Sequence, residues 1–181
     1  MTADKEFGSE ETVLEAVGLP SIPVSAEALV FDRAGRLLIL KPTYKSGWTI
    51  PGGVMEADGE TPWDACRREL AEECGLRIGA GHPARLACMD FRRPRPGKPG
   101  GIRYLFDCGT FGNASLAEIV VQHEEIAEHR VADLRTALTM LRKPIRLRVR
   151  AATRGHAFCY LEDGRPVPGL GADGTFTSAT V

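Results

Sequence analysis

Short apolar runs separated by turn-forming residues dominate the first third of the chain. Two such runs lie between Ile22 and Leu40, on either side of the turn-like sequence 32–35. Runs of this length, bounded by Gly and Asp, are typical of strands, so residues 22–40 are predicted to form a hairpin or two successive strands. A short extended segment is expected at 48–50, and the Pro-Gly-Gly sequence at 51–53 predicts a turn.

Later apolar runs predict four more strands, at residues 85–91, 102–111, 124–131 and 158–161. A helix is expected from about residue 133 to 141. The segment 144–153 fits either a basic helix or a strand, because Ile145, Leu147 and Val149 alternate as they would in a strand. Strands and helices follow one another without a regular βαβ rhythm, and this order favours an α+β fold.

The signals for a helix are most complete over residues 62–74. Thr61 can cap the N-terminus, Pro62 suits the first helical position and Asp64 can complete a capping box. Gly75 can end the helix as a C-cap glycine.

Length and composition indicate one ordinary globular domain. A chain of 181 residues can bury one substantial core. We expect this domain to span residues 21–165. A tail or short helix should precede it at 1–20, and a flexible tail should follow at 166–181, where the composition is polar and rich in small residues.

Charge and cysteine usage narrow the class of protein. The formal net charge is -1, so no global field draws the chain to nucleic acid or to a membrane. The five cysteines form no C-x-x-C pair, which favours reduced thiols in a cytoplasmic protein over zinc ligands or disulfides. No apolar run approaches the ~20 residues that a membrane-spanning helix needs. The first residues also lack the basic start and apolar core of a signal peptide.

Three carboxylates crowd one arc of the predicted helix. Glu69, Glu72 and Glu73 are spaced i, i+3 and i+4, and neighbours at this spacing repel one another when they carry like charges. Either the arc is simply solvated or a cation neutralises it. Carboxylate oxygens suit Mg²⁺, with Mn²⁺ as an alternative. The bare backbone of Gly52 and Gly53 just upstream could approach a metal or a phosphate closely.

The residues around this arc form a longer pattern. Glu60 is followed after seven residues by the sequence RELAEECGL at 68–76. This pattern resembles the signature of the Nudix hydrolases, which reads G, five residues, E, seven residues, R-E-U-x-E-E-x-G-U, where U is bulky and aliphatic. Every fixed position from Glu60 onward is filled. Six residues separate Gly53 from Glu60, one more than the signature has. The resemblance implies an α/β/α sandwich with a mixed β-sheet.

The resemblance also implies a set of metal ligands. Glu72 and Glu73 match the principal ligands of the family, and Glu69 matches a position that binds metal or assists the attacking water. The carbonyl of Gly53, or of Gly52, matches a backbone ligand.

Further site residues follow from the same resemblance. Arg68 matches the arginine that orients the carboxylates, and Glu60 matches its ion-pair partner. Members of the family often take another ligand or a general base from a segment after the signature. Glu124 and Glu125 lie in about that region, where an exposed acidic strand end is the alternative interpretation.

Three features outside the signature could contact a substrate. Arg92, Arg93 and Arg95 lie in the Pro- and Gly-rich loop 92–101, which could clamp substrate phosphates or could be a plain solvated loop. Tyr104 on the next predicted strand could stack on a base or pack in the core. The basic segment 142–154 could touch an anionic ligand, form a solvated helix face or make a dimer contact.

Three functions compete on these grounds. The resemblance implies a Mg²⁺-dependent hydrolase that cleaves the diphosphate linkage of a nucleoside diphosphate joined to another group. Alternatives are a nucleotide-binding regulatory domain that does not hydrolyse its ligand, and a diphosphate isomerase on the same scaffold. The intact set of Arg68, Glu69, Glu72 and Glu73 argues against the binding domain, and the complete signature argues against the isomerase. Nucleotide sugars, ADP-ribose and oxidised nucleoside triphosphates all stay open as substrates, and a homodimer is possible.

Overall fold

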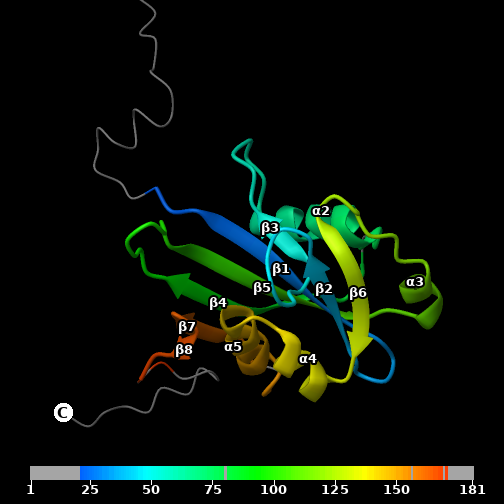
Figure 1. The fold of residues 1–181 in the computed structure, drawn as a ribbon. Helices are drawn as coiled ribbons and strands as arrows, with labels where there is room; N and C mark the ends of the chain where they lie inside the picture. Colours follow the sequence, from blue (N-terminus) through cyan, green and yellow to red (C-terminus); the bar gives the residue numbers. More distant parts are fainter. Residues whose placement is uncertain (1–20, 80, 156, 169, 171–181) are drawn as a thin grey trace, which may run out of the picture.

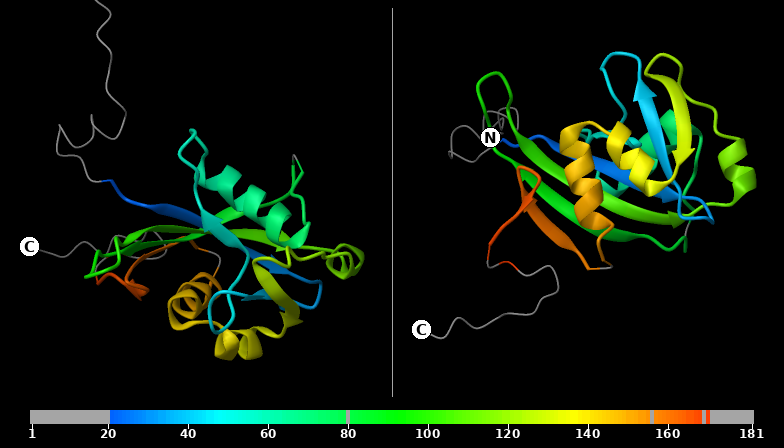
Figure 2. Two further views of the ribbon diagram at one scale, coloured as in Figure 1. Left: turned by 45° about the horizontal axis from the view of Figure 1, so that its top comes forward. Right: turned by 60° about the horizontal axis from the view of Figure 1, so that its bottom comes forward.

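A computed structural model describes residues 21–170, apart from 80, 156 and 169. The tail or helix expected at 1–20 and most of the tail expected at 166–181 lie outside these residues. Helices cover both faces of one mixed sheet, with α2 on one face and α4 and α5 on the other (Figures 1 and 2). The strand order is β6-β2-β1-β5-β4-β7-β8, and β3 pairs with β1 beside β2. The strands are β1 (Val24–Phe31), β2 (Leu37–Pro42), β3 (Gly52–Val54), β4 (Arg85–Arg92), β5 (Gly101–Thr110), β6 (Ile126–Ala132), β7 (Cys159–Glu162) and β8 (Arg165–Pro166).

The sheet confirms the expected fold class. β1 and β2 pair antiparallel as the predicted hairpin, whereas β1 with β5 and β4 with β7 are parallel pairs. Asp32 closes the predicted turn at 32–35. Its carbonyl accepts a hydrogen bond from the N–H of Gly35, and its carboxylate accepts hydrogen bonds from the N–H groups of Ala34 and Arg36. The arrangement is therefore an α/β/α sandwich around a mixed sheet.

The prediction of a turn at 51–53 is wrong. Gly52 and Gly53 belong to the short strand β3, which pairs antiparallel with β1 through Glu27↔Gly52 and Ala26↔Gly53. The sequence signal misleads because Gly is common in turns. Here glycine lets strands β1 and β3 approach closely, because a Cβ on Gly52 would lie 2.6 Å from the Cα of Glu27. The φ of Gly52 is 141°, which disfavours any other residue.

Helix α2 (Pro62–Cys74) has the bounds that its capping signals predict. The Thr61 hydroxyl accepts a hydrogen bond from the N–H of Asp64 and also lies 2.7 Å from the Asp64 carboxylate. Gly75 ends the helix in a left-handed conformation with φ of 68°. The helix turns Cys66, Leu70 and Cys74 into the core.

Two apolar cores hold the layers together. On one face of the sheet α2 packs over β1 and β5, with Trp63 against Phe106 at 5.1 Å between ring centroids. On the other face α4 (Leu134–Met140) and α5 (Lys143–Ala152) pack against residues of β1, β2 and β5 such as Leu29, Ile39 and Leu105. The sheet thus separates the two helical layers.

The remaining elements settle the open predictions. The segment 144–153 is helical as α5, because its buried positions recur at helical spacing. A short helix, α3 (Asn113–Ala117), was not predicted. All five cysteines are free thiols. Within the described part of the chain, no helix is long and apolar enough to cross a membrane.

Candidate active site

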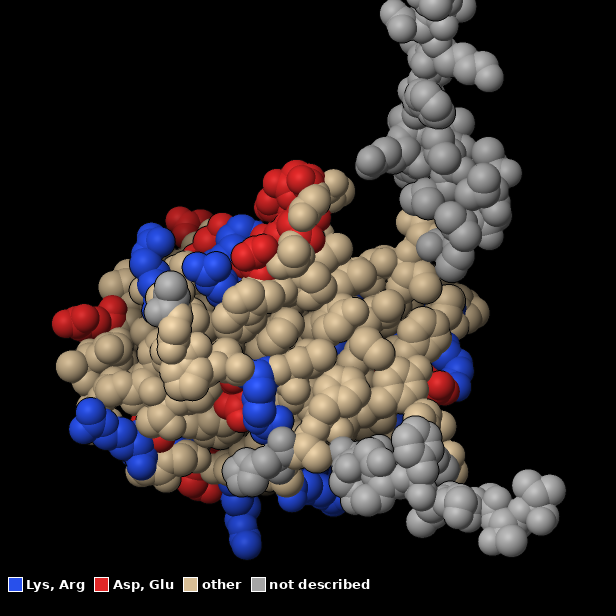
Figure 3. Space-filling model, turned by 180° about the vertical axis from the view of Figure 1, so that it is seen from behind, with Lys and Arg blue, Asp and Glu red and all other residues tan. Residues whose placement is uncertain are grey.

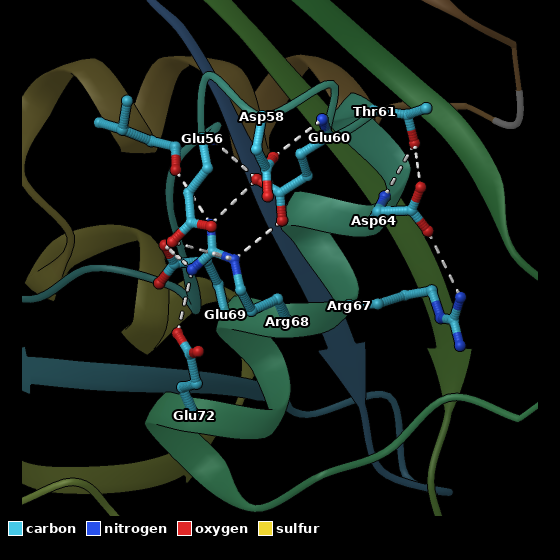
Figure 4. A network of polar contacts seen from close by, with 10 residues as sticks. Glu56, Asp58, Glu60, Thr61, Asp64, Arg67, Arg68, Glu69 and Glu72 are labelled. Carbon is cyan, nitrogen blue, oxygen red and sulfur yellow. Dashed lines mark hydrogen bonds and ion pairs between the residues drawn. The ribbon is translucent and has the colours of Figure 1, made fainter.

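Arg68 is the centre of an ionic network on the exposed side of α2 (Figure 4). Its Nε donates to Glu60 Oε1 at 2.8 Å, and its Nη1 donates to Glu69 Oε1 at 2.9 Å and to Glu72 Oε2 at 3.0 Å. Its Nη2 donates to the carbonyl oxygen of Val54 at 3.1 Å. One guanidinium therefore joins the β3–α2 loop, α2 and β3, and it orients two of the three crowded carboxylates.

The charges of this network also stabilise one another. The hydrogen bonds to Glu60 raise the pKa of Arg68 and lower the pKa of Glu60, so both groups stay ionised at neutral pH. Acidic side chains gather on the segment that projects above the site, which is the β3–α2 loop with Glu56, Asp58 and Glu60 (Figure 3).

Glu73 differs from its neighbours because it is buried. Glu73 is 5% exposed, and its Oε2 accepts a hydrogen bond from the N–H of Gly52 at 2.7 Å. Burial, together with the negative charges of Glu69, Glu125 and Glu27, raises the pKa of Glu73 to about 8. Burial also raises the pKa of Glu69. A negative charge at Glu73 is therefore costly unless a cation offsets it.

The donor set fits a hard divalent cation in its chemistry. Carboxylate oxygens of Glu69 and Glu73 lie against the backbone of β3, and Glu72 lies on the same arc of α2. Such oxygens suit Mg²⁺ or Mn²⁺. Among the described residues, however, no three acidic, His or Cys side chains are already gathered as one ligand set. Glu69 and Glu72 each bind Arg68 through one carboxylate oxygen, so a cation could be bound through the other oxygen.

Glu125 lies close to this cluster, at the turn before β6. The backbone carbonyl of Glu125 accepts a hydrogen bond from the N–H of Thr43 at 2.8 Å, which ties the turn to the end of β2. Its carboxylate is near enough to raise the pKa of both Glu69 and Glu73. The Glu124 carbonyl accepts a hydrogen bond from the Thr43 hydroxyl, but the Glu124 carboxylate is not among the main causes of either pKa shift. Of the two candidates, the structure brings Glu125 to the carboxylates.

Tyr44 is a site neighbour that the sequence pattern did not reveal. It is 63% exposed in the loop after β2, and the charges of Glu73 and Glu125 add to burial in raising the pKa of its hydroxyl. No motif includes Tyr44, because its proximity depends on how the loop after β2 folds back.

The three arginines of loop 92–101 are held by acidic groups of the β7–β8 turn. Arg93 forms ion pairs with Glu162 and Asp163, and Arg95 Nη2 lies 3.1 Å from Asp163 Oδ1. Arg92 Nε is 3.6 Å from the same oxygen. Much of the charge proposed as a phosphate clamp is therefore already paired.

Tyr104 does not join these arginines. It is half-buried on the α2 side of β5, where its ring stacks on Phe106 with 6.4 Å between centroids. Arg148 of the basic segment 142–154 does not lie on a solvated helix face. Its side chain is 4% exposed and binds Glu27 at 2.5 Å and Asp90 at 3.3 Å.

Solved structures share this architecture. The chain superimposes on a MutT protein from Methanosarcina mazei Go1 with a TM-score of 0.60 and 23% identity, covering 74% of this chain and 94% of that one. It also superimposes on the NUDIX domain of Shewanella oneidensis NrtR, complexed with ADP ribose, with a TM-score of 0.60 and 14% identity, covering 78% and 96%. At these identities the likeness shows the fold.

Sequence comparisons reach the same group of proteins. A MutT-like protein from Streptomyces ambofaciens is 41% identical over 64 residues, which make up 35% of this chain and 41% of that protein. The chain thus spans less than half the length of the curated relatives it matches. The model of the NUDIX domain matches residues 22–152, well over half of the chain, and the protein therefore belongs to the NUDIX family.

Proposed function

We propose that the protein is a Mg²⁺-dependent hydrolase that cleaves the diphosphate linkage of a nucleoside diphosphate joined to another group. The observation that carries this proposal is the set of carboxylates around Arg68, with Glu73 buried against the N–H of Gly52. A domain that only binds a nucleotide gains nothing from a buried carboxylate whose ionisation is costly. A domain that binds a divalent cation during catalysis requires one.

The proposed ligands are Glu69, Glu72 and Glu73, with the carbonyl of Gly53. A divalent cation bound there would supply positive charge to the diphosphate oxygens and favour ionisation of the attacking water. The chain's own groups hold the ligands in place: Arg68 orients Glu69 and Glu72, and the Gly52 N–H orients Glu73. Catalysis of this kind depends on positioning and charge rather than on covalent chemistry.

Two carboxylates are candidates for accepting the proton of the attacking water. Glu69 is half-buried and its pKa is raised, so it is a better base near neutral pH than an ordinary carboxylate. Glu125 is exposed and lies on a separate turn next to the cluster. A carboxylate bound to the cation is a poor proton acceptor, so we assign the role to Glu125 if Glu69 is a metal ligand and to Glu69 if it is not.

The proposal is tested by incubating the protein with Mg²⁺ and a panel of ADP-ribose, nucleotide sugars and dinucleoside polyphosphates. Released phosphate species are separated by ion-exchange chromatography. Glu73→Gln should lower kcat/KM roughly 100- to 1000-fold, the loss typical of removing one electrostatic contact to a transition state. Glu118→Gln, on an exposed residue at the end of α3, is the matched control and should leave kcat/KM unchanged.

Two outcomes would contradict the proposal in different ways. No turnover of any compound by the wild-type protein, with binding retained, would support a nucleotide-binding regulatory domain. Turnover that survives Glu73→Gln undiminished would remove Glu73 from its proposed role while leaving hydrolysis in place.

A further inference from the structure

A cavity adjoins the acidic site on the α5 side of the sheet. It has a volume of about 560 Å³ and lies between β1, loop 92–101 and the start of α5. Two residues connect it to the acidic site. Val54 lines the cavity and accepts the hydrogen bond from Arg68, while Glu27 lines it and lies close enough to raise the pKa of Glu73. A molecule with its diphosphate at α2 could therefore extend into this cavity.

The lining of the cavity is strongly basic. Seven of its side chains are Arg or Lys and one, Glu27, is acidic, and no aromatic residue lines it among the described residues. The cavity therefore offers no aromatic side chain on which a base could stack. Guanidinium groups instead favour phosphate oxygens. The seven basic residues are Arg92, Arg93, Arg95, Lys98, Arg103, Arg142 and Arg148.

Two of these arginines have a buried donor without a partner among the described residues. Arg148 is bound to Glu27 and Asp90, and the arginines of the loop are paired with Asp163. In contrast, Arg103 Nη1 and Arg142 Nε are buried and have no hydrogen-bond partner among the residues that the structure describes. A buried donor without a partner destabilises the fold, and more so when it is charged. Both residues line the cavity, so an anion that drew either side chain toward it would give these donors a partner.

The surrounding electrostatics also favour an anion. Arg142 is the N-cap of the ten-residue helix α5, no side chain caps this end, and Pro144 and Ile145 of the first turn line the cavity. The positive end of the helix dipole thus adds to the arginines. Burial and the neighbouring charges of Arg148 and Arg92 lower the pKa of Arg103, which shows how crowded the positive charge is.

We propose that this cavity binds a phosphomonoester group that the substrate carries in addition to the diphosphate linkage, with Arg103 and Arg142 as its ligands. This inference rests on the proposed function for the position of the diphosphate. A phosphomonoester fits better than a single carboxylate because Glu27 is already neutralised by Arg148, so the unpaired charge on the lining calls for a dianion. The preferred substrate is then a nucleotide derivative with at least one phosphate outside the cleaved linkage.

The test uses two compounds that differ by one phosphomonoester, coenzyme A and dephospho-coenzyme A, with NADP⁺ and NAD⁺ as a second pair. Affinity is measured by calorimetry in EDTA, so that hydrolysis does not consume the ligand. In at least one pair the phosphorylated member should bind about tenfold more tightly or better, since the added phosphate would form charge-assisted hydrogen bonds with the arginines. Arg103→Gln and Arg142→Gln should each reduce this preference, whereas Arg150→Gln, exposed on the same helix outside the cavity, should retain it.

The outcomes separate this inference from the proposed function. Equal affinity for both members of both pairs, or a preference that survives in both cavity variants, overturns the inference. Circular dichroism checks that the variants fold, and Arg103→Lys, which keeps the charge, should recover part of the preference. An arginine-dependent preference without turnover in Mg²⁺ would support the cavity and overturn hydrolysis. Turnover of the compounds in Mg²⁺ without any preference would support hydrolysis and overturn the inference about the cavity.

Discussion

Gly53 lies directly against the carboxylate of Glu69, so closely that a Cβ on Gly53 would overlap both carboxylate oxygens. The glycine on β3 therefore leaves the space that Glu69 occupies beside Arg68. Because the overlapping atoms are the far end of a flexible side chain, the conflict can be relieved by moving Glu69 rather than by distorting the fold.

Gly53→Ala should therefore impair the site more than the fold. We expect kcat/KM to fall roughly 100-fold, because a displacement of about 1 Å in a catalytic group can have that effect. The midpoint of thermal unfolding should change little. A variant with full activity would show that the position of Glu69 is not critical.

Gly52→Ala should instead impair the fold more than the site. Its Cβ would meet the backbone of β1 at Ala26 and Glu27, which cannot move without disrupting the sheet, and φ at Gly52 is 141°. We expect a loss of unfolding free energy of about 1–3 kcal/mol, measured by urea denaturation. An unfolding midpoint equal to that of Gly53→Ala would contradict this distinction.

The signature predicted the helical half of the site well, and the rest depended on tertiary contacts. The caps of α2 follow from local spacing and the pairing of Arg68 with Glu60 follows from the family resemblance, and both are present. The turn expected at Gly52 is wrong because a close approach between strands requires glycine as much as a turn does. Tyr44 and Arg103 could not be found from spacing, since distant segments bring them to the site.

Removing the charge of Glu73 should separate stability from metal binding. The raised pKa of about 8 keeps Glu73 largely protonated in the fold at neutral pH, which costs stability relative to the ionised unfolded state. Glu73→Gln should therefore unfold in EDTA at a temperature equal to or above that of the wild type. Mg²⁺ should raise the unfolding temperature of the wild type, because a ligand of the native state stabilises it. It should raise that of the variant much less. Scanning calorimetry with and without Mg²⁺ checks both points, and an equal rise in the two proteins would exclude Glu73 as a ligand.

The β1–β2 turn should make stability depend on pH in the acid range. Asp32 Oδ1 accepts hydrogen bonds from the N–H groups of Ala34 and Arg36, and these bonds lower the pKa of the Asp32 carboxyl. A group whose pKa is lower in the folded state stabilises the fold above its unfolded pKa of about 4. This contribution is lost as the pH falls through the folded pKa.

Asp32→Ala should therefore destabilise the protein at pH 7, and the difference from the wild type should shrink as the pH is lowered from about 4. Urea denaturation at a series of pH values measures it. Asp58→Ala, on an exposed residue of the β3–α2 loop, serves as the control at each pH. A destabilisation that stays constant down to pH 2 would mean that the ionised carboxylate is not what closes the turn.

The buried cluster of Arg148, Glu27 and Asp90 should be the most sensitive polar feature of the fold. Asp90 is 0% exposed, and besides Arg148 it binds the N–H of Gly164 at 2.8 Å. Arg148→Met keeps much of the side-chain volume but leaves two carboxylates without their cation, so we expect a loss of about 3–5 kcal/mol of unfolding free energy. Arg150→Met, exposed two residues later on α5, should cost little. Adding Asp90→Asn to Arg148→Met should restore part of the loss, since it removes one unpaired buried charge. If the double variant is instead less stable than Arg148→Met by the full cost of Asp90→Asn alone, the two side chains are not energetically coupled.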